Sequence, residues 1–454
     1  MNLDIIILAA GQGARMRSVL PKVLHPLGGR PLLAHVLETA RRFDKAKLHV
    51  VVGHGGDRVR DAFPDPAIHW VTQEQQLGTG HAVAQVLPRV PNDHAVLVMY
   101  GDVPLIRKET LGALQEIAME NQVGLLTAEL DDPAGYGRIL RAADGSIVGS
   151  VEEKDATDEQ CKIREVNTGF VAAPAGDLRN WVNSLDNNNT QGEYYLTDII
   201  ARAVTDGTKV CGVTTRDRNE VLGVNTRAQL ATLERGYQLR QAMACMEDGV
   251  TLIDPDRFDL RGRMVAGQDV VIDVNAVLEG EITLGDRVHI GPNCVLRNIT
   301  AGDDVTILAN CVLEEATIGN ASRIGPFSRI RPETHLAENT RVGNFVEIKN
   351  SVIANGSKVN HLSYIGDTTV GRDVNIGAGT ITCNYDGANK HRTVIGDDVF
   401  IGSDTQLIAP VTVADGATIG AGSIITTDAP AGELTLSRVP QETRKGWKRP
   451  VKKK

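Results

Sequence analysis

The sequence predicts a two-part α/β protein in which a doubly wound, mostly parallel sheet domain precedes a parallel β-helix. In the first half, short apolar strands alternate with amphipathic helices, as expected for a sheet covered by helices. In the second half an aliphatic residue returns at every sixth position over two stretches: Ile318, Ile324, Ile330, Leu336, Val342 and Ile348, then Ile395, Ile401, Leu407, Val413, Ile419 and Ile425. One short strand and one tight turn fill six residues, whereas neither the helical nor the strand period alone explains this spacing.

The first domain is predicted to span residues 1–227. Its predicted strands are Ile5–Leu8, Leu48–Val52, Ala95–Met99, Gly124–Ala128 and Gly169–Ala172. Its predicted helices include Pro31–Arg41, His81–Leu87 and Lys108–Met119. In such a Rossmann-like sheet, ligands bind at the carboxyl ends of the strands. Residues 228–248 are rich in helix formers and predict a linker helix that ends near Gly249.

The β-helix is predicted to fill residues 249–454, with the repeat itself between about 250 and 430. Glycine often follows the aliphatic position, and we expect these glycines to supply corner angles that other residues adopt less readily. The repeat is interrupted at Ala354–Gly356 and at Asn384–Arg392, and both segments are expected to loop out. A chance run of aliphatic residues in a β-sandwich is the alternative, which twelve hits in two phased stretches disfavour.

Length and composition limit the class of protein. A chain of 454 residues is too long for one ordinary core, and 42% apolar and 23% charged residues are typical of a soluble protein. A net charge of −9 argues against general nucleic-acid binding. The six cysteines form no Cys-x-x-Cys pair, which favours reduced thiols over disulfides or zinc. The apolar run Ile5–Ala10 is too short to span a membrane, so we expect a cytoplasmic protein without a membrane partner.

A glycine-containing turn follows the first strand and predicts a phosphate site. The residues run Leu8-Ala9-Ala10-Gly11-Gln12-Gly13-Ala14-Arg15-Met16, and Pro21-Lys22 follows shortly after. Small residues let backbone N–H groups approach a triphosphate, while Arg15 and Lys22 supply positive charge. A bare strand–turn–helix connection would explain the glycines equally well. The turn is not a Walker loop, because Gly-Lys-Ser/Thr is absent.

Two further segments are expected to converge on this turn. Gln73 to His81 contains carboxamides that could read a base edge, together with the Gly78-Thr79-Gly80 turn. Tyr100-Gly101-Asp102-Val103-Pro104-Leu105 follows a strand and places the Asp102 carboxylate at its end, where oxygen ligands suit Mg²⁺. An isolated aspartate in that position is more often a helix N-cap or a turn residue.

These motifs resemble the sugar-1-phosphate nucleotidyltransferases. The matching elements are Leu-Ala-Ala-Gly-x-Gly-x-Arg-Met, Pro-Lys, Gln-x-x-x-x-Gly-Thr and Gly-Asp-x-Pro-Leu. Together with the hexapeptide half, the chain resembles the family of bifunctional N-acetylglucosamine-1-phosphate uridyltransferases/glucosamine-1-phosphate acetyltransferases, from Leu3 to Lys454. The family usually has threonine where this chain has Ala14. The resemblance implies that the β-helix is left-handed and that the chain forms a homotrimer.

The resemblance implies roles for the N-terminal residues. Asp102 and Asn225 would ligate Mg²⁺, Gln73 would read the uracil edge, and Arg15 and Lys22 would neutralise the phosphates. The sugar phosphate would then attack the α-phosphorus of UTP in line, and pyrophosphate would leave. The remaining implied contacts to UTP or the acetamido sugar are Leu8, Ala9, Ala10, Gly11, Gly78, Thr79, Tyr100, Gly101, Gly137, Glu152 and Asn167.

Polar residues interrupt the aliphatic coils of the second half. Arg331, Glu347, Lys349, His361, Tyr364 and Asn375 are the ones to inspect. Arg331 and Lys349 could bind a phosphate, and His361 could accept a proton near neutral pH. Singly, each could equally be an ordinary outward-facing residue. A prism with flat faces has no deep pocket, so sites are expected between neighbouring prisms in an oligomer.

The resemblance implies that His361 is the general base that takes a proton from the 2-amino group of glucosamine 1-phosphate, which then attacks acetyl-CoA. Arg331 and Lys349 would clamp the sugar phosphate, Tyr364 and Asn375 would orient the sugar, and Glu347 would orient the imidazole. The implied acetyl-CoA contacts are Ala378, Asn384, Tyr385, Ser403, Ala421 and Arg438. The Asn384–Arg392 loop would act as a lid, and the tail beyond Arg438 is basic and otherwise unassigned.

The expected function is therefore synthesis of UDP-N-acetylglucosamine by acetyl transfer and then uridylyl transfer. Two other functions remain open from the sequence. One is a single-activity nucleotidyltransferase whose β-helix only oligomerises or regulates, and the other is a non-enzymatic subunit of a translation-initiation exchange factor. His361 with Arg331 and Lys349 argues against the first, and Arg15, Lys22 and Asp102 argue against the second.

Overall fold

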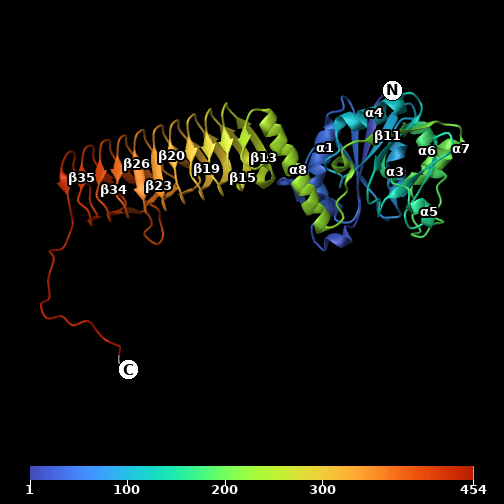
Figure 1. The fold of residues 1–454 in the computed structure, drawn as a ribbon. Helices are drawn as coiled ribbons and strands as arrows, with labels where there is room; N and C mark the ends of the chain where they lie inside the picture. The colour runs from blue at the N-terminus through green and yellow to red at the C-terminus, as the bar shows by residue number, and fades with distance from the viewer. Residues whose placement is uncertain (453–454) are drawn as a thin grey trace. The chain divides into compact units, whose positions relative to one another are not determined.

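The computed structural model describes residues 1–452 and divides the chain into two compact units, Met1–Tyr237 and Gln238–Lys454. In Figure 1 the first unit runs from blue to green and the second from green to red. The helix α8 (Arg227–Glu247) contains the division, so its first half belongs to the first unit and its second half to the β-helix. Within the described part of the chain, no helix is both long enough and apolar enough to cross a membrane.

The first unit is a mostly parallel sheet with the strand order β11-β7-β10-β6-β1-β4-β5. Its strands are β1 (Leu3–Ala9), β4 (Lys47–Val52), β5 (Ile68–Thr72), β6 (Ala95–Tyr100), β7 (Val123–Glu129), β10 (Glu165–Pro174) and β11 (Val210–Thr215). Only β10 runs antiparallel to its neighbours β6 and β7. The short strands β8 (Gly137–Arg141) and β9 (Ile147–Val151) extend the sheet from β10, and β2 (Pro26–Leu27) and β3 (Arg30–Pro31) form a separate hairpin.

Helices cover both faces of this sheet. They are α1 (Leu32–Arg41), α2 (Gly56–Ala62), α3 (Thr79–Val86), α4 (Lys108–Met119), α5 (Asp158–Cys161), α6 (Ala175–Asn183) and α7 (Ile199–Thr205). Strand β1 alternates between the two cores: Ile5 and Ile7 pack in the cluster that holds residues of α1 and α4, and Ile6 in the cluster that holds residues of α3, α6 and α7. The doubly wound fold predicted from the sequence is thereby confirmed.

The second unit is a parallel β-helix whose coils each contribute strands to stacked ladders (Figure 1). One ladder consists of β12 (Thr251–Leu252), β14 (Val271–Ile272), β16 (His289–Ile290), β18 (Thr306–Ile307), β20 (Arg323–Ile324), β23 (Arg341–Asn344), β26 (Lys358–His361), β29 (Asn375–Ile376), β32 (Phe400–Ile401), β35 (Thr418–Ile419) and β37 (Leu434–Thr435). From β12 to β35 each coil has a single inward aliphatic residue on this face, such as Ile324 and Val342, which pair in register.

The remaining strands form the other faces. Four long strands come first: β13 (Phe258–Ala266), β15 (Ala276–Leu284), β17 (Val295–Ala301) and β19 (Val312–Ile318). Shorter ones follow: β21 (Arg329–Ile330), β22 (Thr334–Leu336), β24 (Glu347–Lys349), β25 (Val352–Ile353), β27 (Tyr364–Gly366), β28 (Thr368–Val370), β30 (Ile381–Cys383), β31 (Thr393–Ile395), β33 (Gln406–Ile408), β34 (Val411–Val413) and β36 (Ile424–Ile425). The aliphatic residues of the predicted repeat are buried in one continuous core.

The two predicted interruptions behave differently. Residues 384–392 do leave the coil and project as an orange loop in Figure 1, between β30 and β31. The prediction for Ala354–Gly356 is wrong, because the Ala354 N–H donates to Val370 O at 2.9 Å and the segment stays in the ladder. The phase of the repeat changes earlier, where Ile348 and Ile353 are five residues apart and Asn350 turns the corner with φ 44°.

Most of the glycines after the aliphatic positions serve a different purpose from the one predicted. Gly325 has φ 97°, as predicted, but Gly343 has no positive φ, and a Cβ built on it would lie 1.9 Å from Asn360 O of the next coil. Positive φ values occur more often at residues such as Asn339 and Asp404. Glycines such as Gly343 are needed because successive coils approach each other closely.

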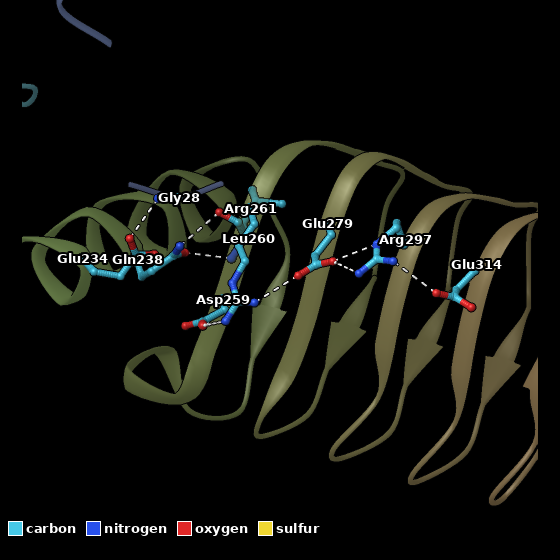
Figure 2. Close-up of polar contacts among 9 residues, drawn as sticks. All are labelled: Gly28, Glu234, Gln238, Asp259, Leu260, Arg261, Glu279, Arg297 and Glu314. Atoms are coloured by element: carbon cyan, nitrogen blue, oxygen red, sulfur yellow. Dashed lines mark hydrogen bonds and ion pairs between the residues drawn. The ribbon is translucent and has the colours of Figure 1, made fainter. Parts of the chain in front are cut away.

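Polar contacts close the open end of the β-helix. The Gln238 carboxamide, only 1% exposed, accepts from Leu260 N at 2.7 Å and donates to Leu260 O at 3.2 Å (Figure 2). It thus occupies the hydrogen-bonding positions that a preceding strand would take beside β13, which protects an otherwise open edge. In the first unit, Glu234 of the same helix accepts from Gly28 N at 2.9 Å.

Candidate functional site

A cavity of about 530 Å³ opens at the carboxyl ends of β1 and β6 in the first unit. Its lining residues are Leu8, Ala9, Ala10, Gly11, Gln12, Lys22, Val23, Gln73, Gln76, Gly78, Thr79, Ala82, Tyr100, Asp102 and Glu193. The segments at Leu8, Gln73 and Tyr100 therefore converge here, as the topology of a parallel sheet requires. Sequence reasoning missed Glu193, which lies on an irregular loop far along the chain.

Backbone contacts shape this cavity. The Gly101 N–H donates to Leu8 O at 2.9 Å, which fixes the ends of β1 and β6 side by side. Gly13 has φ 63°, and a Cβ on it would lie 2.9 Å from the Lys22 Cβ. Glycine at this position therefore lets the Lys22 stem approach the turn after β1. The exposed Arg15, on the short helix η1 (Ala14–Met16), is not among the lining residues.

Lys22 connects the two residues expected to hold a metal. Its ammonium lies 2.5 Å from Asp102 Oδ2 and 3.2 Å from Asn225 Oδ1. The Lys22 and Asp102 side chains are 13% and 14% exposed, so the pair is partly removed from water. Two oxygen donors thus already surround one cation, and one carboxylate and one amide oxygen fit Mg²⁺, which keeps waters and phosphate oxygens as its other ligands.

Gly137, Glu152 and Asn167 gather beside this cavity and do not line it. Asn167 pairs with Gly137 in the sheet, and the Thr197 hydroxyl donates to Glu152 Oε1 at 3.0 Å. Asn167 Oδ1 accepts from Gly169 N at 2.8 Å. Gly169 lies against the Tyr100 ring so closely that a Cβ there would fall 2.7 Å from it. Tyr100, which lines the cavity, therefore separates the two groups of residues.

Burial raises the pKa of one side chain in each of these two groups of residues, Glu152 and Tyr100. Burial raises the pKa of Glu152, although the Thr197 hydrogen bond opposes the shift. Burial, with smaller contributions from Glu152 and Asp102, raises the pKa of the Tyr100 phenol. Tyr100 is a neutral hydrogen-bond donor at physiological pH, and the shift moves its pKa further from that range.

A ladder of alternating charge runs along one face of the β-helix (Figure 2). Arg261 Nη1 lies 3.0 Å from Glu279 Oε1, and Arg297 bridges Glu279 at 2.6 Å and Glu314 at 3.2 Å. The next residues at the same position of the repeat are Arg331 and Lys349, two cations in succession. The charges no longer alternate at these two residues, and an anion bound between the coils of Arg331 and Lys349 would restore the alternation.

Other charges complete this cationic cluster. Arg331 Nη1 forms an ion pair with Glu347 Oε1 at 2.7 Å. Lys390, on the projecting loop, lies against Lys349 and lowers the pKa of that ammonium. The buried Asp367 accepts from Asn350 and Asn384, each at 2.5 Å, and holds the start of the loop beside the coils. Sequence reasoning missed Lys390, since only the return of the loop brings it here.

His361 at the end of β26 has a different neighbour from the one expected. Its Nδ1 lies 3.2 Å from Asn344 Oδ1, one coil earlier and directly opposite in the ladder. Glu347 instead pairs with Arg331, so the prediction that Glu347 orients the imidazole has no contact in this structure to support it. Asn344 occupies the same position of the repeat as His361, which is a signal that the sequence did contain.

Small residues continue this row along one edge of the prism. Ala378, Ser403 and Ala421 occupy the His361 position in the three following coils. Backbone bonds fix their spacing, as Asp404 N donates to Ala378 O at 2.7 Å and Gly422 N to Ser403 O at 2.8 Å. Arg438 lies over the last coil, with Nη2 3.5 Å from where a Cβ on Gly420 would be. The edge can therefore receive an extended ligand with a negative end.

The other residues expected at this site lie around the row. Asn375 is on β29 and Tyr364 on β27, on the two strands that flank the edge. Asn384 Nδ2 lies 3.4 Å from the Tyr364 hydroxyl, which links the loop to that face. Tyr385 is 61% exposed on the loop, and its hydroxyl donates to Gly387 O at 2.6 Å.

Comparisons with known proteins match both halves of the chain. Residues 5–155 match the MobA-like NTP transferase domain, residues 267–298 the bacterial transferase hexapeptide (six repeats), and residues 324–419 the GMPPB C-terminal domain. The chain is 58% identical to the "Bifunctional protein GlmU" of Ralstonia nicotianae, over 100% of this chain and 99% of that protein. It is 58% identical to the protein of the same name from Alkalilimnicola ehrlichii, over 99% of this chain and 96% of that protein. The corresponding protein of Azoarcus is 56% identical, over 100% of both chains.

Proposed function

The chain belongs to the family of bifunctional GlmU proteins, and from this premise we propose which of its residues carry each activity. The chain is a bifunctional transferase of UDP-N-acetylglucosamine synthesis, with a nucleotidyltransferase and a hexapeptide acetyltransferase domain. Acetyl transfer to glucosamine 1-phosphate comes first. Uridylyl transfer to the acetylated product follows.

For uridylyl transfer, we propose that UTP occupies the cavity at the end of β1. Leu8, Ala9, Ala10 and Gly11 would face the nucleotide, Gln73 the base, and Gly78 with Thr79 the nucleoside. The small turn after β1 supports this, since it leaves backbone N–H groups free to approach phosphates. The acetamido sugar would lie beside Tyr100 and Gly101, against Gly137, Glu152 and Asn167.

Charge neutralisation would dominate this reaction, because two polyanions must meet. Asp102 and Asn225 would hold Mg²⁺, which supplies positive charge to the phosphates when bound. The Lys22 ammonium would turn from these oxygens to the α-phosphate as the nucleotide enters. Arg15 is exposed at the mouth of the turn and would neutralise the outer phosphates.

For acetyl transfer, the row of small residues is the observation that carries the assignment. Acetyl-CoA would lie along Ala378, Ser403 and Ala421, with Arg438 at a CoA phosphate and the Asn384-Tyr385 loop over the pantetheine arm. The thioester would then reach His361 at the other end of the row. His361 would take the proton from the sugar amine as the amine attacks the thioester carbonyl, and the CoA thiolate would leave.

The phosphate of glucosamine 1-phosphate would bind at the break in the charge ladder. Arg331 and Lys349, together with Lys390, supply the cations, and Tyr364 and Asn375 would orient the sugar. Glu347 would hold Arg331 in place, and Asn344 would hold the imidazole. Two assays test the whole assignment: CoA-thiol release with glucosamine 1-phosphate, and pyrophosphate release with UTP and the acetylated sugar. Loss of only the first in His361→Ala, and of only the second in Lys22→Met, is expected.

We further propose that three copies of the chain associate through their β-helices. Phe327, Phe345 and Leu362 form an apolar row that is 51%, 55% and 63% exposed, next to Asn344 and His361. All three have a positive φ, of 56°, 56° and 50°, which is strained for such side chains and positions them outward. A second copy covering this row would also complete the site around His361. Phe345→Glu is expected to lower the mass in solution and acetyl transfer together, while uridylyl transfer persists.

The free thiols support a reducing, cytoplasmic location. All six cysteines are unpaired, and burial raises the pKa of Cys245 and Cys383. The proposed substrates are small molecules of the cytoplasm. No nucleic acid or membrane partner is proposed.

A further inference from the structure

The Gln73 carboxamide lies at the wall of the nucleotide cavity and is 3% exposed. Its Nε2 lies 3.1 Å from Gly78 O and 3.0 Å from His81 Nδ1. A backbone carbonyl can only accept a hydrogen bond, so the Gln73 atom that faces Gly78 must be the donor Nε2. The contact with Gly78 therefore favours one of the two orientations of this amide.

The Gly78 carbonyl itself is fixed. Gly78 has φ 109°, and a Cβ on it would lie 2.6 Å from Tyr194 O. On either side of it, Tyr194 N donates to Leu77 O and Gly80 N donates to Tyr194 O, both at 2.8 Å. The acceptor that holds one hydrogen of the Gln73 amide is consequently part of a rigid turn.

His81 holds the second hydrogen of the same amide. Because Nε2 of Gln73 is a donor, His81 Nδ1 must be the unprotonated nitrogen, and the imidazole proton lies on Nε2. Gln85, one helical turn further along α3, has its Nε2 3.2 Å from both His81 O and His81 Nε2. The His81 carbonyl can only accept, so this Gln85 nitrogen is a donor and does not accept the imidazole proton.

Both hydrogens of the Gln73 amide are thus engaged, and its Oε1 is left for a ligand. Among residues 1–452 no hydrogen bond to this oxygen is formed. An oxygen can only accept, so it matches a base that offers an N–H. Uracil has an N–H at N3, whereas cytosine has an unprotonated nitrogen there, which would face the oxygen as a second acceptor.

We propose that His81 is a positioning residue that selects uracil over cytosine by fixing the Gln73 amide with Oε1 toward the base. This inference rests on the proposed binding of UTP in the same cavity and adds the device that sets the base preference. Without an acceptor at position 81, one of the two hydrogen bonds that hold this orientation is lost, and the Gln73 amide turns over more readily. Its NH₂ group can then face the ligand and accommodate cytosine N3.

The test compares kcat/KM for UTP and CTP in the full-length chain with the acetylated sugar phosphate. His81→Phe keeps a ring but has no acceptor, and it is expected to lower the UTP/CTP ratio by about ten- to a hundredfold. His81→Asn places a carbonyl oxygen near the position of Nδ1, and it is expected to retain most of the ratio. Dissociation constants for the two nucleotides should change in parallel.

Urea unfolding of the first unit, followed by the fluorescence of Trp70 and Trp181, reports whether each variant is folded. A folded His81→Phe chain that keeps the wild-type UTP/CTP ratio overturns the inference. Equal loss of the ratio in His81→Asn and His81→Phe overturns it as well, since the acceptor would then not matter. A wild-type chain that does not prefer UTP would contradict the proposed uridylyl transfer instead.

Discussion

The Lys22 ammonium lies 2.5 Å from Asp102 Oδ2, and its charge thereby occupies the place between the two oxygens proposed for the metal. Lys22→Met removes this competing cation. Binding of Mn²⁺, used as the probe, to the nucleotide-free chain is therefore expected to tighten by about tenfold. Uridylyl transfer is expected to fall by about two to three decades, because the phosphates lose a neutralising charge.

Calorimetric titration of Mn²⁺ and a pyrophosphate-release assay measure these two effects. Lys47→Met is the matched control, because Lys47 is an exposed lysine at the amino end of β4, opposite the cavity. It should change neither quantity. Unchanged Mn²⁺ affinity in Lys22→Met would show that the Lys22 charge does not compete with the metal.

His361→Ala should lower acetyl transfer by about two to four decades, the usual contribution of a well-placed base. Asn344→Ala should lower it by about tenfold, because the imidazole then loses its only side-chain partner among the described residues. CoA-thiol release measures both. His335→Ala changes an exposed histidine on another face and should have no effect. Larger damage from Asn344→Ala than from His361→Ala would reverse the proposed roles.

Lys390→Ala should raise KM for glucosamine 1-phosphate by about tenfold and change kcat little, since the lysine would contact a phosphate that does not react. Thiol-release kinetics at varied sugar phosphate give both constants. Lys358→Ala is the control on the neighbouring face. A fall in kcat with an unchanged KM would place Lys390 near the reacting amine instead.

Asp198→Asn should stabilise the first unit at pH 8 and have little effect at pH 4. Burial, with repulsion from Glu152 and Asp186, raises the pKa of Asp198 from 3.8 to about 6. An ionised Asp198 therefore opposes folding above about pH 6, by on the order of 2 kcal/mol, and this penalty disappears as pH falls below the unfolded value. Urea unfolding at the two pH values, followed by tryptophan fluorescence, measures the difference. An equal effect at both pH values would contradict this assignment.

Asp4→Asn should have the opposite sign. Asp4 is fully buried and accepts from His49 and His94, each at 2.6 Å. Burial alone would raise the pKa of Asp4, but these two hydrogen bonds outweigh it and hold the pKa below 3.8. The ionised group thus stabilises the fold above about pH 4, and its contribution is lost as pH falls through the lowered native pKa. The variant should lose about 3 kcal/mol at pH 7 and less at pH 3, by the same urea measurement.

The sequence predicted the coil because one inward aliphatic residue per strand is enough to define a thin prism. It could not predict where the six-residue spacing shortens to five, because the positive φ of Asn350 accommodates that change at the corner. The expectation for the glycines failed at positions such as Gly343 for a related reason. The distance between neighbouring coils is a property of the stacked structure and does not follow from a local run of residues.

The residues of the candidate sites likewise divide into those that the sequence could predict and those that it could not. Leu8, Gln73 and Asp102 could be brought together from strand topology alone. Asn344 could have been predicted from the repeat, because it occupies the same repeat position as His361 one coil earlier, although its residue type alone does not indicate a role. Lys390 and Glu193 could not be found, because each reaches its place through an irregular loop whose path depends on contacts such as those of Asp367.

Ala378, Ser403 and Ala421 occupy the same position in successive coils, so distance along this edge of the prism increases by a fixed step from coil to coil. Neighbouring coils are about 4.8 Å apart, so the span from Arg438 to His361 is a whole number of coil heights. Deleting one 18-residue turn of the chain between them would shorten the distance from Arg438 to His361 by one coil height. The number of coils between Arg438 and His361 therefore determines how long an acyl carrier must be for its thioester to reach the imidazole.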